Sequence, residues 1–120
     1  MLDKKGNHMT KQALVPIADG SEEIEAVTII DVLRRAGVEV TVAFVGDGET
    51  KQITGARGTK IVADSFIADC VDKAWDLIAV PGGIEGADNL AASEILDQLL
   101  RNQAQQGKFY AAICAAPAVV

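Results

Sequence analysis

The segment FYAAICAAP, residues 109–117, decides the fold of this chain. Its first five residues form an apolar run with the length of a buried strand. Cys114 follows among small residues, which are the neighbours that a tight strand-to-helix turn carrying an exposed nucleophile tolerates. A helix starting there would direct its positive end at the sulfur and favour the reactive thiolate. The alternative is an unreactive cysteine in the core, one of the commonest places for this residue, and spacing does not separate the two.

Upstream of this segment, short apolar runs alternate with longer segments of helical periodicity. The order of these segments indicates an α/β fold with a doubly wound, mostly parallel sheet. Ligands of such sheets bind beyond the carboxyl ends of the strands. Strands are predicted at residues 13–18, 38–45, 76–80 and 109–113, and short extended pieces at 52–58 and 59–63. Helices are predicted at residues 22–36, 65–73 and 92–106.

Three glutamates follow the first predicted strand, at Glu22, Glu23 and Glu25. The ordinary explanation is electrostatic, because acidic residues favour the first turn of a helix. The functional alternative is that one of them turns inward toward the strand ends. A desolvated carboxyl there would stay protonated, donate a hydrogen bond to a thiolate, and act as a general base once ionised.

Pro81-Gly82-Gly83 ends the strand predicted at 76–80. It forms either a simple glycine turn or a set of backbone N–H groups that bind an oxyanion. Cys70 lies in a predicted amphipathic segment with no activating neighbour, so we expect it to be structural.

Composition restricts the classes of function. The chain has 120 residues, enough for one domain, and a net charge of −6, which argues against nucleic acid as the primary partner. No apolar run approaches the roughly 20 residues of a membrane span, and no signal peptide is visible. The two cysteines do not form a disulfide framework, which suits the cytoplasm.

The two ends of the chain differ from its body. Residues 1–8, MLDKKGNH, are polar and patternless, so we expect a vector-derived leader before a single α/β domain at 9–120. These eight residues include His8, the only histidine of the chain. Because the sequence has neither a cluster of metal-ligating residues nor a nucleotide-binding motif, we expect neither a metal nor a cofactor. The sequence stops at Val120, about one and a half turns into the final predicted helix, so we expect this chain to be the N-terminal portion of a longer domain.

Four motifs occur together in a specific order. The chain resembles the ThiJ/PfpI superfamily, and within it the DJ-one/YajL-like branch, from about residue 11 to residue 120. The resemblance implies a flavodoxin-like fold in which Glu25 is the protonated partner of Cys114. The motifs are DGSEEIE at 19–25, DVLRRAG at 31–37, VPGG at 80–83 and AAICAAP at 111–117.

The same resemblance implies further site residues and a partner. Gly82 and Gly83 would lie beside the thiol, with the Gly83 and Ala115 amides facing a small anion or oxyanion. Arg35 and Arg57 align with arginines that the family places near the pocket and the dimer contact. The family further implies a homodimer.

This chain departs from the family pattern at two places. Ala115 follows Cys114 where protease-type members often have histidine, so a Cys-His pair at that position is excluded and peptidase activity is not expected. The DJ-one branch usually supplies a pocket histidine from its C-terminal third, and none is present here.

Three hypotheses follow. The first is a cofactor-independent thiol enzyme, similar to glyoxalase III or a deglycase, that converts small dicarbonyls such as methylglyoxal to lactate or acts on glycated substrates. The second is a redox-sensing stress-response protein or chaperone whose Cys114 is oxidised to sulfinate. The third is a flavodoxin-like binding domain with a core cysteine.

Overall fold

The computed structural model describes residues 10–114 and 116–118, so the predicted leader lies outside the described residues. The two 3-10 helices carry the labels η1 and η2. The elements are β1 (Gln12–Ile17), α1 (Glu23–Arg35), β2 (Glu39–Phe44), β3 (Gln52–Thr54), β4 (Lys60–Val62), β5 (Ser65–Phe66), η1 (Ile67–Cys70), β6 (Leu77–Val80), α2 (Ile84–Ala91), α3 (Glu94–Gln105), β7 (Phe109–Ala112) and η2 (Ala116–Ala118).

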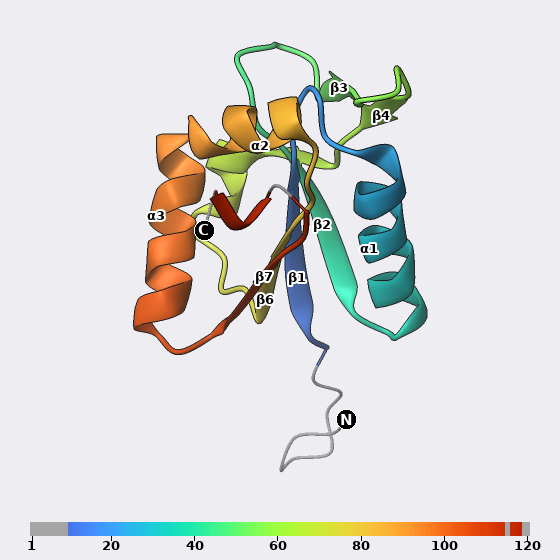
Figure 1. Ribbon diagram of the computed structural model, residues 1–120. Helices are drawn as coiled ribbons and strands as arrows, with labels where there is room; N and C mark the ends of the chain where they lie inside the picture. Colours follow the sequence, from blue (N-terminus) through green and yellow to red (C-terminus); the bar gives the residue numbers. More distant parts are fainter. Residues whose placement is uncertain (1–9, 115, 119–120) are drawn as a thin grey trace.

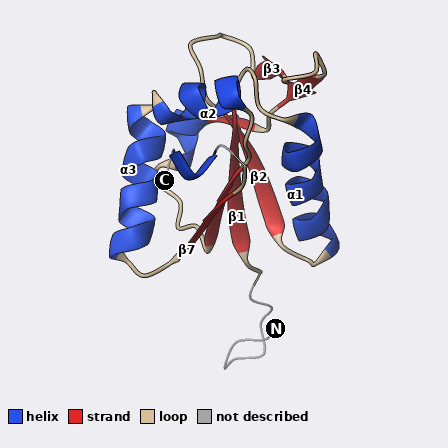
Figure 2. Cartoon of the chain, viewed as in Figure 1, coloured by secondary structure: helices blue, strands red, loops and turns tan. Residues whose placement is uncertain are grey.

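A five-stranded parallel sheet forms the centre of the molecule, in the order β5-β2-β1-β6-β7. Helix α1 covers one face, and α2 and α3 cover the other (Figures 1 and 2). The predicted doubly wound, flavodoxin-like arrangement is therefore confirmed. Because the strands are parallel, the carboxyl ends of β1, β6 and β7 lie at one edge of the sheet, and the strand order reverses between β1 and β6.

The core divides into two apolar clusters, one on each face of the sheet. Because successive residues of a strand point to opposite faces, Leu14 packs on the α2–α3 side and Val15 on the α1 side. Trp75, Leu90 and Leu100 belong to the first cluster and Ala26 to the second. Both sides of each central strand are thus buried, as parallel sheets require.

Two segments differ from the sequence-based expectation. Residues 65–73, predicted as a helix, form the short strand β5 followed by η1, since Phe66 pairs with Phe44 of β2. Helix α2 was not predicted. Its sequence, IEGADNLA, contains a glycine and no full apolar period, and it forms directly after the turn at Gly83.

The predicted pieces at 52–58 and 59–63 form β3 and β4, an antiparallel hairpin separate from the main sheet. It lies above the N-terminal end of α1 (Figure 1).

The turn after β1 does not cap α1 through a side chain. The N-cap residue Glu22 makes no side-chain cap bond. Instead, the Ser21 hydroxyl accepts from the Ala18 N–H at 3.1 Å, and Asp19 Oδ1 accepts from the Thr54 N–H at 2.9 Å. These residues hold the loop and the hairpin together. Helix α3 is capped by a side chain, because Ser93 Oγ accepts from the Leu96 N–H at 3.1 Å.

No helix in the described part of the chain is both long and apolar enough to cross a membrane.

Candidate functional site

Cys114 follows β7 in a strained turn. Its φ of 58° is the only positive φ found at a non-glycine residue within the described ranges. Such a left-handed backbone is uncommon for residues with a side chain and clusters at functional sites. The turn closes with a 2.9 Å hydrogen bond from the Ala116 N–H to the Ile113 carbonyl, and the Cys114 side chain is exposed. Ala115, the other residue expected here, lies outside the described residues.

Gly82 separates Cys114 from Glu25. A methyl group on its Cα would lie 2.5 Å from Glu25 Oε1, 2.7 Å from Cys114 Cβ and 2.7 Å from the Ile113 carbonyl oxygen. A side chain does not fit there, so this glycine is required by close approach rather than by backbone freedom. The carboxyl of Glu25 and the side chain of Cys114 thus meet across one backbone carbon.

A hydrogen bond fixes the carboxyl in that position. The Gly82 N–H donates to Glu25 Oε1 at 2.9 Å, and the Glu22 N–H donates to the Gly82 carbonyl at 3.1 Å. The Gly82 N–H is therefore bonded to Glu25, and a role of Gly82 in binding an anion stays a prediction. Gly83 adopts φ +94° and packs directly against the Gly20 carbonyl, and within the described residues its N–H has no partner.

The two arginines lie apart from one another. Arg35 ends α1, ten residues or about 15 Å along the axis from Glu25, and pairs with Asp31 at 2.8 Å on the surface. It therefore does not reach the Cys114 site of its own chain, and its role as a dimer contact stays a prediction. Arg57, at the hairpin tip, lies 3.7 Å from the Glu22 carboxylate, which places it near the N-terminus of α1.

Glu23 has a structural role that its position in a helix's first turn did not predict. It is only 9% exposed. Its carboxylate accepts from the Arg57 N–H at 2.9 and 3.0 Å and from the Thr59 N–H at 3.0 Å. Burial raises the pKa of Glu23, but the backbone hydrogen bonds from Thr59 and Arg57 outweigh it and hold the pKa at about 2. In the sequence, the one signal of this contact between Glu23 and the β3–β4 turn is that the turn contains two glycines, Gly55 and Gly58.

This lowered pKa predicts a pH-dependent contribution to stability. A carboxyl whose pKa falls on folding stabilises the fold above its unfolded pKa of about 4.5, and the contribution is lost as the pH falls toward about 2. We expect the difference in unfolding free energy between the wild type and Glu23→Gln to be constant above about pH 5 and to shrink below it. Urea unfolding at pH 7, 4 and 2.5 measures this, and a difference independent of pH would contradict it.

Cys70 is a core residue, as expected. It is 2% exposed, and burial raises the pKa of its thiol. The Trp75 indole N–H donates to its carbonyl at 3.0 Å. Cys70 therefore contributes to packing and Cys114 alone offers an accessible thiol in the described part of the chain.

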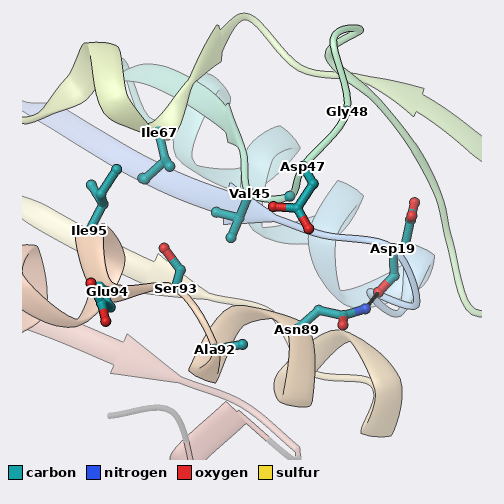
Figure 3. A pocket seen from close by; sticks show the side chains of 11 residues that line it. Asp19, Val45, Asp47, Gly48, Ile67, Asn89, Ala92, Ser93, Glu94 and Ile95 are labelled. Carbon is teal, nitrogen blue, oxygen red and sulfur yellow. Dashed lines mark hydrogen bonds between the residues drawn. The ribbon is translucent and has the colours of Figure 1, made fainter.

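A cleft with no contribution from Cys114 lies elsewhere on the described part of the chain. It has a volume of about 680 Å³ and opens between the loop after β2 and the α2–α3 junction (Figure 3). Asp19, Asp47 and Glu94 contribute carboxylates to it, and the Asn89 amide donates to the Asp19 carbonyl at 2.8 Å. It holds no thiol, so it is separate from the chemistry expected of Cys114. Over residues 10–114 and 116–118 no cluster of three or more His, Cys, Asp or Glu side chains suits a metal ion.

The parallel, doubly wound sheet defines a flavodoxin-like α/β protein. Its candidate site is a cysteine that lies in a strained turn beyond the last strand and faces a carboxyl across a glycine. The model of the DJ-1/PfpI family matches residues 11–120, and the chain belongs to that family.

Comparison with individual proteins supports this family assignment. The chain is 50% identical over 111 residues to Protein DJ-1 homolog B of Arabidopsis thaliana, covering 92% of this chain and 25% of that protein. It is 36% identical over 111 residues to glutathione-independent glyoxalase DJR-1.2 of Caenorhabditis elegans, covering 92% of this chain and 58% of the relative. The structure of oxidized DJ-1 from Toxoplasma gondii is 48% identical with a TM-score of 0.88, covering 92% of this chain and 59% of that one. The chain thus spans between a quarter and three fifths of the length of these relatives.

Proposed function

We propose that the intact protein is a cofactor-independent thiol enzyme that converts small dicarbonyls such as methylglyoxal to hydroxy acids such as lactate. The observation that carries this proposal is the meeting of Glu25 and Cys114 across Gly82. A thiol and a carboxyl in contact with one substrate supply a nucleophile and a proton carrier, which this conversion needs. The name of the Caenorhabditis elegans relative, a glutathione-independent glyoxalase, supports it.

The proposed steps balance with one water. The Cys114 thiolate adds to the aldehyde carbon, and the new alkoxide takes a proton to give a hemithioacetal. Glu25 removes the proton from that carbon and returns a proton to the neighbouring carbon, while the hydroxyl proton of the hemithioacetal passes to the ketone oxygen, which converts the hemithioacetal to a thioester. Water then cleaves the C–S bond and releases lactate and the thiol. The Gly83 N–H is the donor proposed to face the developing oxyanion, with Ala115 as its expected second member.

An alternative function is redox sensing, in which peroxide oxidises Cys114 without turnover of a dicarbonyl. The exposure of Cys114 favours it, and the Toxoplasma gondii structure is described as oxidized. Turnover of methylglyoxal with and without Cys114 separates the two functions. Peroxide treatment followed by mass spectrometry tests the second, which fails if Cys114 is not oxidised in preference to Cys70.

Both functions require a selectively reactive thiol. We expect iodoacetamide to modify Cys114 at least about tenfold faster than Cys70 at pH 7, because the Cys70 thiol is buried and its pKa is raised. Peptide mass spectrometry over time measures both rates in one sample. Equal rates, or faster modification of Cys70, would favour the third hypothesis of a binding domain with an inert cysteine.

We propose that the protein forms a homodimer, with a second copy of the chain as its partner. We also propose that it is located in the cytoplasm. Ile24 and Val27 support a homodimer, since they are 76% and 50% exposed and share one face of α1. We expect Ile24→Asp to shift the sedimentation of the intact protein from dimer to monomer. Val71→Asp changes an exposed valine elsewhere and should leave the dimer intact, and an unchanged Ile24→Asp dimer would refute this interface.

A further inference from the structure

We propose that Glu23 is a positioning residue: it clamps the β3–β4 hairpin onto the first turn of α1 and thereby holds Glu25 in place against Gly82 and Cys114. The inference rests on the proposed Glu25–Cys114 pair and adds the residue that orients it. Glu23 itself touches neither the thiol nor the glycine turn.

The clamp is a set of charge-assisted hydrogen bonds. Both oxygens of the Glu23 carboxylate accept from the Arg57 N–H, and Oε2 also accepts from the Thr59 N–H. A methyl group on Gly55 would lie 2.5 Å from the Glu23 carboxyl carbon, so the hairpin turn closes tightly around this side chain. Hydrogen bonds to an ionised acceptor are roughly twice as strong as neutral ones.

The hairpin also binds the loop between β1 and α1. The Gly20 N–H donates to the Thr54 carbonyl at 2.9 Å, and the Ala56 N–H donates to the Ser21 carbonyl at 2.9 Å. The loop at 18–22 is therefore attached on one side to the hairpin through the same turn that Glu23 holds.

The other side of this loop reaches the site. Gly83 packs against the Gly20 carbonyl, and Glu22 donates its N–H to the Gly82 carbonyl. Two residues after Glu23, Glu25 accepts the Gly82 N–H. The first turn of α1 is thus fixed between the hairpin, through Glu23, and the glycine turn, through Glu25. Loosening the hairpin contact frees the turn that carries Glu25.

A comparison within the chain separates this role from ordinary helix electrostatics. Glu94 is the first residue of α3, as Glu23 is of α1, and the two have the same relation to a helix dipole. Glu94 is exposed, whereas Glu23 is buried and bonded to two distant backbone amides. Glu94→Gln is therefore a matched control for Glu23→Gln.

The test uses Glu23→Gln in the intact protein, because the glutamine amide replaces one acceptor oxygen with a donor that faces the hairpin N–H groups. Hydrogen exchange should show faster exchange at the Arg57 and Thr59 amides. The pH profile of Cys114 alkylation should move upward by about half to one pH unit, which corresponds to a roughly three- to tenfold lower rate on its rising limb. Gly55→Ala disturbs the same clamp from the hairpin side and should move both readouts in the same direction.

A double-mutant cycle shows whether the effect passes through Glu25. In a Glu25→Gln background, Glu23→Gln should no longer move the Cys114 profile, because the group it positions is gone. An equal shift in both backgrounds, a Cys114 profile unchanged despite faster hairpin exchange, or the same shift in Glu94→Gln would overturn the inference while leaving the proposed pair intact. If Glu25→Gln alone leaves the profile of Cys114 unchanged, the proposed pair itself is wrong.

Discussion

Cys114→Ala is expected to reduce methylglyoxal turnover by the intact protein by roughly a thousandfold or more, as loss of a nucleophile does in other covalent catalysts. The reason is chemical: without the thiolate no bond to the aldehyde carbon forms, and Glu25 has no hemithioacetal from which to move a proton. The assay is lactate formation over time, with kcat and KM measured separately. The side chain of Cys114 is exposed, so the free energy of unfolding should change by no more than about 0.5 kcal/mol.

Cys70→Ala provides the matched control for this experiment. It removes the other thiol from the core, where Cys70 packs beside Trp75, and should lower stability while leaving turnover near that of the wild type. Wild-type turnover in Cys114→Ala would refute the enzyme hypothesis. Selective oxidation of Cys114 in a protein without dicarbonyl turnover would favour the redox alternative.

Gly82→Ala has the second largest expected effect, because the new methyl group would meet Glu25 Oε1, Cys114 Cβ and the Ile113 carbonyl at 2.5–2.7 Å. Overpacking of this kind typically costs about 1–3 kcal/mol of unfolding free energy. The turn and the carboxyl must also move apart, and a displacement of about 1 Å at a catalytic group can cost on the order of a hundredfold in rate. Urea unfolding and kcat/KM for methylglyoxal measure the two losses.

Gly48→Ala is the control for Gly82→Ala. Neither glycine has a φ in the left-handed range, and a methyl group on Gly48 would lie 3.4 Å from the nearest atom, in the Phe44 ring. We expect nearly unchanged stability and turnover for Gly48→Ala. If Gly82→Ala behaved in the same way, close contact among Glu25, Gly82 and Cys114 would not matter for function.

Local patterns predicted most of the sheet but not the segments formed by distant contacts. The strands at β1, β2, β6 and β7 appear as apolar or alternating runs. Burial on both faces explains the continuous apolar runs of β1 and β6. The edge strand β7 was expected to be buried, but Phe109 and Tyr110 are exposed. Residues 65–73 were misassigned because Ser65 and Phe66 pair with β2 and residues 67–70 form a 3-10 helix, which their own composition does not reveal. Helix α2 was missed because its eight residues form against the core rather than by their own propensity.

At the site, the motifs selected Cys114 and Glu25, and the structure brings their segments together. The motifs did not reveal that the Gly82 N–H binds Glu25. Glu23 was assigned to helix electrostatics, since a first-turn acid is common and the two N–H groups that donate to its carboxylate lie 34 and 36 residues away.

Residue order alone was thus sufficient for the fold class and for the position of the turn after the last strand, because these depend on periodicity, turn residues and neighbours in the chain. The choice of Cys114 as the reactive thiol rested on the family motifs. The strained φ of Cys114, the glycine between thiol and carboxyl, and the buried glutamate that holds the hairpin came only with the folded chain. The approach of Glu25 and Cys114 to Gly82 depends on the carboxyl ends of β1, β6 and β7 lying at one edge of the sheet, and the Glu23 contact depends on the distant β3–β4 hairpin.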